Sequence, residues 1–224
     1  MIKNRTTQLV FQTIYITLAL IGFIASLGYF DKSFNNEFYV FYTNLSNYIC
    51  MGLMVAVWIK TIKQAHRKED GFVDTAPKFT FMCNIMILIT FLVYNILLAK
   101  DNSVFDYFTS ISNLLMHVTL PIIFIVHWAL FYKHGKTKWY YPLLCTIMPL
   151  IYVVFILIRA SILPTNTTAT VYPYFFLNLN ELGWGGFIGW IFALLVFFIA
   201  IGYIFYACDN IVCWKNKKRA NTNN

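Results

Sequence analysis

The stretch WGGFIGWIFALLVFFIAIGYIFYA, from Trp184 to Ala207, contains no Asp, Glu, Lys or Arg. A helix needs about 20 mainly apolar residues to cross the roughly 30 Å hydrocarbon core of a bilayer. This stretch is therefore long and apolar enough to be a transmembrane helix. The whole chain has the same character, because 59% of its 224 residues are hydrophobic and only 12% are charged, which is not the composition of a soluble globular domain.

Similar apolar runs account for most of the chain. They cover about 7–30, 38–62, 78–99, 104–132, 138–160 and 184–207. The first run is too long for the apolar part of a signal peptide and is expected to be a retained helix. We therefore expect an all-α, polytopic integral membrane protein whose single domain, 1–224, contains six transmembrane helices.

The basic residues fall unequally on the two sides of this predicted bundle. Lys32, Lys100 and Arg159 belong to one side. The other side has Lys3, Arg5, Lys60, Lys63, Arg67, Lys68, Lys78, Lys133, Lys136, Lys138, Lys215, Lys217, Lys218 and Arg219. Lys and Arg are retained on the cytoplasmic side during insertion, so both termini are expected in the cytoplasm, most simply at the cell membrane. This bias accounts for the net charge of +8, and we expect no nucleic-acid partner.

The five cysteines, Cys50, Cys83, Cys145, Cys208 and Cys213, lie in or near the predicted helices and form no C-x-x-C pair. This pattern favours neither a disulfide framework nor a zinc site. One deep histidine cannot supply both axial ligands of a haem. The sequence therefore predicts no metal and no cofactor.

Two polar clusters interrupt the apolar pattern, FYTNLSN at 41–47 and YFTSISN at 107–113. Each places Thr, Ser and Asn at positions i, i+3 and i+4, which share one face of a helix. Such clusters join helices by hydrogen bonds, or they form part of a site. His117 follows the second cluster by one turn and is the only histidine near the middle of a predicted span, where an ionisable group is costly.

The depth of each residue in the bundle distinguishes the two clusters. At about 1.5 Å per residue, a helix rises roughly 25 Å from Lys60 to Thr43 and roughly 24 Å from Lys133 to His117. Thr109 lies about 12 Å farther out than His117. The sequence therefore predicts that Thr43 and His117 lie at one level, and that Tyr94 and Asn95 of the third helix lie near it.

A hydroxyl, an imidazole and several amides are the minimum for nucleophilic acyl transfer, because the imidazole takes the hydroxyl proton and donors stabilise the oxyanion. In this interpretation Thr43 is the nucleophile and His117 is the general base. The supporting groups are drawn from Asn44, Asn47, Tyr94, Asn95 and Asn113.

Three motifs resemble one known family. FYTNLSN on the second helix, SNLLMHVTLP on the fourth and YPYFF in the last outer loop are similar to motifs of the androgen-induced six-helix membrane hydrolases and their bacterial relatives. The resemblance implies a threonine hydrolase of fatty-acid esters of hydroxy fatty acids, with Thr43 as nucleophile and His117 as its histidine partner. Membrane lipids or lipid esters would then be the substrates.

The outer end of the fifth predicted helix carries Arg159, and an aromatic loop with Tyr172 and Tyr174 follows it. An arginine at a helix end can extend to lipid phosphates. Alternatively its planar guanidinium can hold the carboxylate of an amphipathic lipid, with help from Tyr172 or Tyr174.

Two other function classes fit the same residues. A transporter of small solutes or protons would use His117 in a polar path, although no broken helix or inverted repeat is evident. A non-catalytic lipid-binding membrane protein would need only the apolar bundle. The sequence leaves the oligomeric state open.

Overall fold

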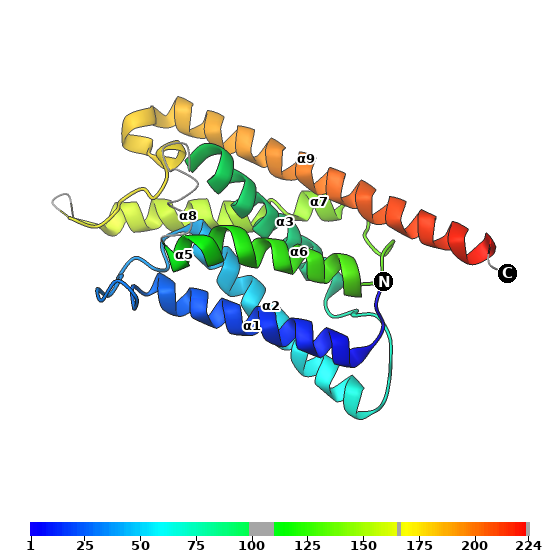
Figure 1. Ribbon diagram of the computed structural model, residues 1–224. Coiled ribbons are helices and arrows are strands. Elements are labelled where there is room, and N and C mark those ends of the chain that lie inside the picture. Colours follow the sequence, from blue (N-terminus) through cyan, green and yellow to red (C-terminus); the bar gives the residue numbers. More distant parts are fainter. Residues whose placement is uncertain (99–109, 165–166, 223–224) are drawn as a thin grey trace.

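The computed structural model describes residues 1–98, 110–164 and 167–222, and their regular structure is helical (Figure 1). The α-helices are α1 (Arg5–Ser26), α2 (Tyr42–His66), α3 (Pro77–Val93), α5 (Ile111–Leu114), α6 (Leu120–Phe131), α7 (Tyr141–Leu144), α8 (Ile147–Ile162) and α9 (Leu179–Thr222). Two π-helical turns, η1 (Tyr94–Leu98) and η2 (Leu115–Thr119), and one 3₁₀ turn, η3 (Phe175–Leu177), complete the set.

Within these described residues, six helical segments are long and apolar enough to cross a membrane, which confirms the predicted all-α architecture. They comprise 5–26, 42–66, 77–97, 111–131, 141–162 and 179–214. The third segment joins α3 to η1, and the fourth joins α5, η2 and α6. Figure 1 shows both termini at the same end of the bundle, which is here called the terminal end.

Local backbone chemistry places several helix ends away from the predicted boundaries. The first helix ends at Ser26 rather than near residue 30, because the chain turns at Gly28, whose φ is +80°. A Cβ at Gly28 would lie 1.9 Å from the Ser33 carbonyl oxygen, so only glycine fits this turn. The second helix begins at Tyr42 rather than near residue 38.

The fifth and sixth predicted helices are both interrupted. The run 138–160 is divided into α7 and α8 at Cys145 and Thr146, because Pro149 has no N–H to donate to the Cys145 carbonyl. The last helix extends beyond 184–207 at both ends and breaks at Gly183, whose φ of 62° and ψ of 173° are not helical. The predicted run 104–132 is observed from Ile111 onward, because 104–109 lie outside the described residues.

The main core lies between α1, α2, α3 and α6, where Met54, Met116, Leu120 and Phe124 are buried. The last two membrane-length segments are less buried than the others. Only 17% of each apolar window of α7–α8 and α9 is buried inside the protein, against 33–50% of the other four. These two segments therefore leave most of their residues outside the buried core.

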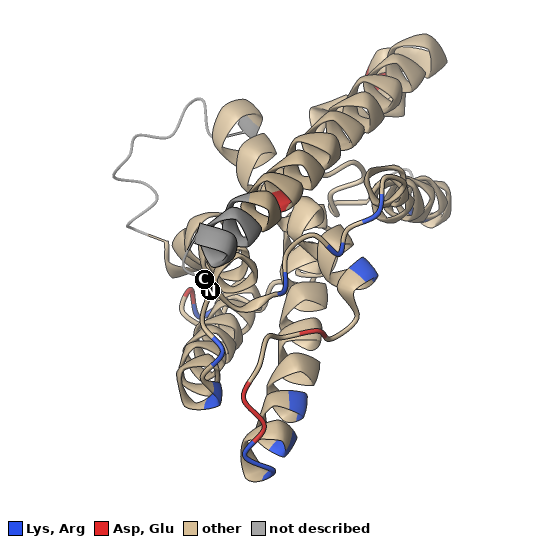
Figure 2. Ribbon diagram, turned by 90° about the vertical axis from the view of Figure 1, so that its right-hand side faces the viewer, with Lys and Arg blue, Asp and Glu red and all other residues tan. Residues whose placement is uncertain are grey.

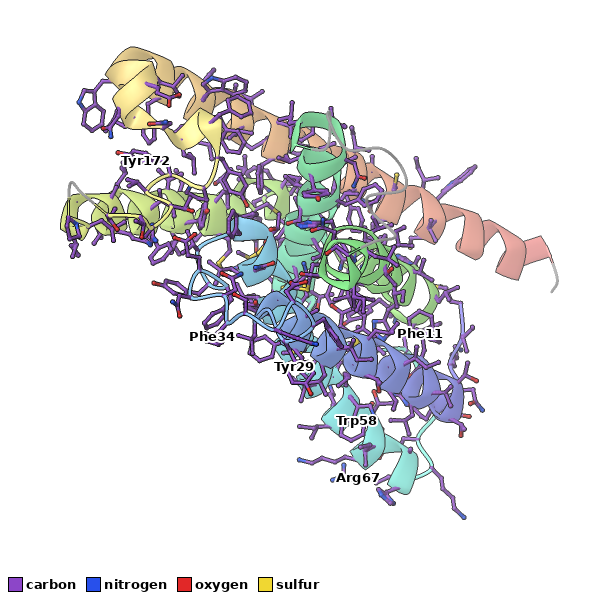
Figure 3. The ribbon with its side chains drawn as sticks, turned by 60° about the vertical axis from the view of Figure 1, so that its left-hand side comes forward. Phe11, Tyr29, Phe34, Trp58, Arg67 and Tyr172 are labelled. Atoms are coloured by element: carbon purple, nitrogen blue, oxygen red, sulfur yellow. The ribbon has the colours of Figure 1, made fainter. Side chains whose placement is uncertain are left out.

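The terminal end carries many of the charged side chains, including Arg67 near the end of α2 (Figures 2 and 3). Lys60 and Asp74 form an exposed ion pair of 2.6 Å at this end. Because the basic residues accumulate where the two termini lie, their distribution agrees with the charge bias of the sequence.

A buried cluster of hydrogen-bonded polar groups joins α9 to the loop after α6, toward the terminal end. His134 Nδ1 lies 2.7 Å from Asp209 Oδ1 of α9, and its Nε2 lies 3.1 Å from the Ala129 carbonyl oxygen. Asp209 Oδ2 also accepts hydrogen bonds from the Gly135 N–H at 3.0 Å and the Thr137 hydroxyl at 2.6 Å. Both side chains of the pair are buried, so this cluster fixes α9 to the loop after α6.

Candidate active site

A polar chamber lies at the end of the bundle opposite the termini. Its volume is about 830 Å³, and it is lined by the loop between α1 and α2, the first turns of α2, the two π-helical turns and the loop before α9. The polar groups relevant to chemistry that line it are Thr43, Asn44, Tyr94, Asn113, His117 and Tyr174. Thr43 and His117 are thus brought to the wall of one cavity.

The backbone around His117 departs from the ordinary α-helix. Residues 115–119 form the π-helical turn η2, which ends two residues before Pro121. In an α-helix the His117 carbonyl would accept a hydrogen bond from residue 121, but proline has no N–H. The wider turn accommodates this missing donor, and π-helical turns are frequent at functional sites.

His117 stacks on Tyr94, the first residue of the other π-helical turn. The two ring centroids are 3.5 Å apart and the planes are inclined by only 1°. Nδ1 of His117 is buried and has no hydrogen-bond partner among the described residues. The imidazole is therefore held in position by stacking, and its Nδ1 makes no hydrogen bond to the described residues.

Thr43 is the second residue of α2, and Tyr174 lies beside it. The Thr43 N–H donates to the Tyr174 hydroxyl at 3.4 Å, and both side chains are buried. Burial raises the pKa of Tyr174 to about 12, although hydrogen bonding to Thr43 opposes this shift. The phenol therefore stays protonated at neutral pH and can donate a hydrogen bond in the chamber.

Asn47 connects α2 to the π-helical turn that contains His117. Its Nδ2 donates to the Thr43 carbonyl at 2.8 Å and to the Met116 carbonyl at 2.8 Å. Met116 precedes His117, so one amide fixes the backbone next to both candidate groups. Asn47 is not on the chamber wall. It is placed to position Thr43 and His117 rather than to contact a substrate.

The other predicted supporting residues divide into two sets. Asn44 and Asn113 line the chamber, where Asn44 Nδ2 donates to the Phe38 carbonyl at 3.0 Å. Asn95 does not line it, and its Nδ2 donates to the Phe91 carbonyl at 2.7 Å within its own helix. Tyr172 lies in the loop between α8 and α9 and is also absent from the chamber wall (Figure 3).

Arg159 of α8 does not line the chamber. It forms a clasp with Glu37 of the loop before α2 and with Thr170 and Val171 of the loop after α8. Its guanidinium donates to the Thr170 carbonyl, to the Val171 carbonyl at 3.4 Å and to Glu37 Oε1 at 3.4 Å. Glu37 also accepts from the Thr170 N–H at 2.6 Å and the Thr170 hydroxyl at 2.5 Å. The charge of Arg159 is thus matched by a carboxylate of this chain.

The loop between α1 and α2 lines the chamber with residues that the sequence did not predict. Ser26, Asn35 and Glu37 from this region line the chamber. The polar run DKSFNNE at 31–37 was the available signal, but no helical period places a loop residue against a helix. Thr109 of the second polar cluster lies outside the described residues.

In the described part of the chain, no group of three or more His, Cys, Asp or Glu side chains is placed to hold a metal ion. Comparisons with protein-family models, curated proteins and solved structures found no match for this chain.

Proposed function

We propose that the protein is a membrane-embedded hydrolase of lipid esters. The observation that carries this proposal is the placement of Thr43 and His117 on the wall of one polar chamber within an apolar bundle. A hydroxyl and an imidazole in one enclosed space are the groups that acyl transfer requires. The resemblance of their two motifs to the six-helix threonine hydrolases supports the same roles.

In the first half of the reaction, the Thr43 oxygen forms a bond to the ester carbonyl carbon and its proton passes to His117. The tetrahedral intermediate then breaks the bond to the alcohol oxygen, which takes the proton from His117 and leaves. In the second half, His117 removes a proton from water as the water oxygen attacks the acyl-threonine. The carboxylic acid departs and the proton returns to Thr43.

The developing oxyanion needs donors close to Thr43. The Tyr174 hydroxyl is hydrogen-bonded to the Thr43 N–H, and the Asn44 and Asn113 amides line the same space. Asn47 contributes indirectly, because it fixes the backbone of Thr43 and of Met116. Tyr94 supports the His117 ring by stacking.

The packing beneath the chamber favours an enzyme over a transporter. Met54, Leu120 and Phe124 belong to the buried core that fills the bundle between the chamber and the terminal end. A transporter that used His117 would need a path through this region. We further propose that the terminal end is cytoplasmic, at the cell membrane, so that the chamber belongs to the outer half of the bilayer.

The direct test of this proposal is covalent labelling by an ester-reactive fluorophosphonate probe, with the modified residue located by mass spectrometry. We expect labelling of the purified protein at Thr43, and loss of labelling in Thr43→Ala. Ser46→Ala is the matched control, because Ser46 is a buried hydroxyl on the same helix that donates to the Tyr42 carbonyl and does not line the chamber. Equal labelling of wild type and Thr43→Ala would refute the proposal.

A further inference from the structure

A second cavity adjoins the candidate active site on the other side of Thr43. It is an apolar slot of about 60 Å³ between α3, α8, α9 and the residues around η3. Its walls are mostly aliphatic and aromatic, and include Val93, Leu150, Val153, Phe176, Ile191 and Leu194. No Asp, Glu, Lys or Arg of the described residues lines it.

Thr43 and Tyr174 line both the apolar slot and the polar chamber. The Thr43 N–H donates to the Tyr174 hydroxyl at 3.4 Å, so the pair marks the boundary between the two spaces. A molecule that reacts at Thr43 therefore has one side that faces polar groups and another that faces hydrocarbon. An ester of a long-chain acid has this division at its carbonyl carbon.

The slot lies beside the part of the protein that faces lipid. The Leu150 side chain on its wall is 40% exposed, and the two membrane-length segments that contain α8 and α9 are the least buried of the bundle. A hydrocarbon chain can therefore enter sideways from the bilayer without passing through water. The chamber, by contrast, is bordered by polar loops.

We propose that the apolar slot binds the first carbons of the acyl chain of the ester, so that the carbonyl carbon lies at Thr43, the rest of a long chain extends toward lipid beside α8 and α9, and the alcohol portion occupies the polar chamber. This assignment rests on the proposed function and adds to it the part of the substrate that each space takes. It makes acyl chain length the property that the slot selects, because each buried methylene group contributes about fourfold to binding.

Two neighbouring valines of α8 provide a matched test. Val153 lines the slot, whereas Val154 is 54% exposed and faces away from it. In Val153→Phe, kcat/KM for a dodecanoyl ester should fall roughly tenfold or more, the equivalent of losing about two methylene contacts. The acetyl ester of the same alcohol should change less than about twofold, and Val154→Phe should leave the whole chain-length profile unchanged.

A binding measurement separates this inference from the proposed function. A fatty acid that carries a photoreactive diazirine near its end should, on illumination, label peptides of α8 and α9 in Thr43→Ala as well as in wild type. Val153→Phe should weaken that labelling, and Val154→Phe should not. If no ester is hydrolysed but this pattern appears, the slot still binds an acyl chain and only the proposed function fails.

The opposite result overturns the slot alone. If Thr43-dependent hydrolysis is found but Val153→Phe and Val154→Phe share one chain-length profile and one labelling pattern, the acyl chain lies elsewhere. A uniform loss of activity on all esters in Val153→Phe, with unchanged labelling and thermal stability, would count against the assignment in the same way.

Discussion

His117 and His134 are both buried, toward opposite ends of the bundle, and their surroundings differ. Both ring nitrogens of His134 face acceptors, and the Asp209 carboxylate beside it accepts two further hydrogen bonds. His117 borders the polar chamber, and its Nδ1 has no partner among the described residues. A buried polar group with all its hydrogen bonds made stabilises a fold, whereas a buried group without a partner requires another explanation, such as a catalytic role.

The widest expected difference between the two ends is their side of the membrane. In a background with Cys208 and Cys213 replaced by Ser, we expect a membrane-impermeant maleimide to label Asn36→Cys on intact cells and to miss Glu69→Cys. Asn36 lies at the chamber end and Glu69 follows α2 at the terminal end. Permeabilised cells provide the control for accessibility. Labelling of Glu69→Cys alone would place the chamber on the cytoplasmic side.

The next largest effect belongs to the chamber. Thr43→Ala and His117→Ala should each lower kcat/KM for a lipid ester by about 10³-fold or more, and the double variant should be scarcely worse than either, because a nucleophile and its base act together. Thermal denaturation in detergent verifies folding. Additive losses in the double variant would mean that the two residues do not act in one step.

At the terminal end the same type of change should affect stability instead. Asp209→Asn removes a carboxylate from a buried pair, so the free energy of unfolding should fall by roughly 3 kcal/mol while activity per folded molecule is retained. Asp74→Asn is the control, since its ion pair with Lys60 is exposed and should contribute less than about 1 kcal/mol. A loss of kcat in folded Asp209→Asn protein would abolish the distinction between the ends.

The smallest expected effect concerns the clasp formed by Arg159, Glu37 and Thr170. Arg159→Gln should lower stability by roughly 1–2 kcal/mol, because its contacts with Glu37 and the Thr170 carbonyl are only partly buried. Glu37→Gln should cause a similar loss, and the two should be non-additive. Rates for a free-acid lipid ester and its methyl ester should change together. A selective loss of the free-acid substrate would instead restore Arg159 as a carboxylate-binding residue.

The sequence predicted the features that depend on hydropathy and helical rise. Apolar runs located the six membrane-length helices, and depth counting placed Thr43, His117 and Tyr94 at one level, where all three line one chamber. The break between α7 and α8 could not be predicted from hydropathy, because an apolar run has the same hydropathy whether or not its helix is continuous. It depends on one missing donor at Pro149.

The details of the site were less accessible for two physical reasons. Asn44 and Asn47 are three residues apart and share one face of α2, so helical period does not separate them, and only packing decides that Asn44 reaches the chamber and that Asn47 bridges backbone carbonyls. The partner of Arg159 is Glu37, a loop residue far away in sequence, and loop contacts have no periodic signal. The pairing of His134 with Asp209 likewise joins a loop residue to a helix far away in sequence.

The pair formed by His134 and Asp209 also sets an order of assembly. A ribosome delivers His134 with the fourth membrane-length helix but delivers Asp209 only with the sixth. Until then the imidazole and the Thr137 hydroxyl have no carboxylate to bind, and the growing chain must keep them hydrated or shielded. The arrival of the last helix therefore completes this cluster, and a chain that stops before Asp209 leaves the His134 imidazole and the Thr137 hydroxyl without their carboxylate partner.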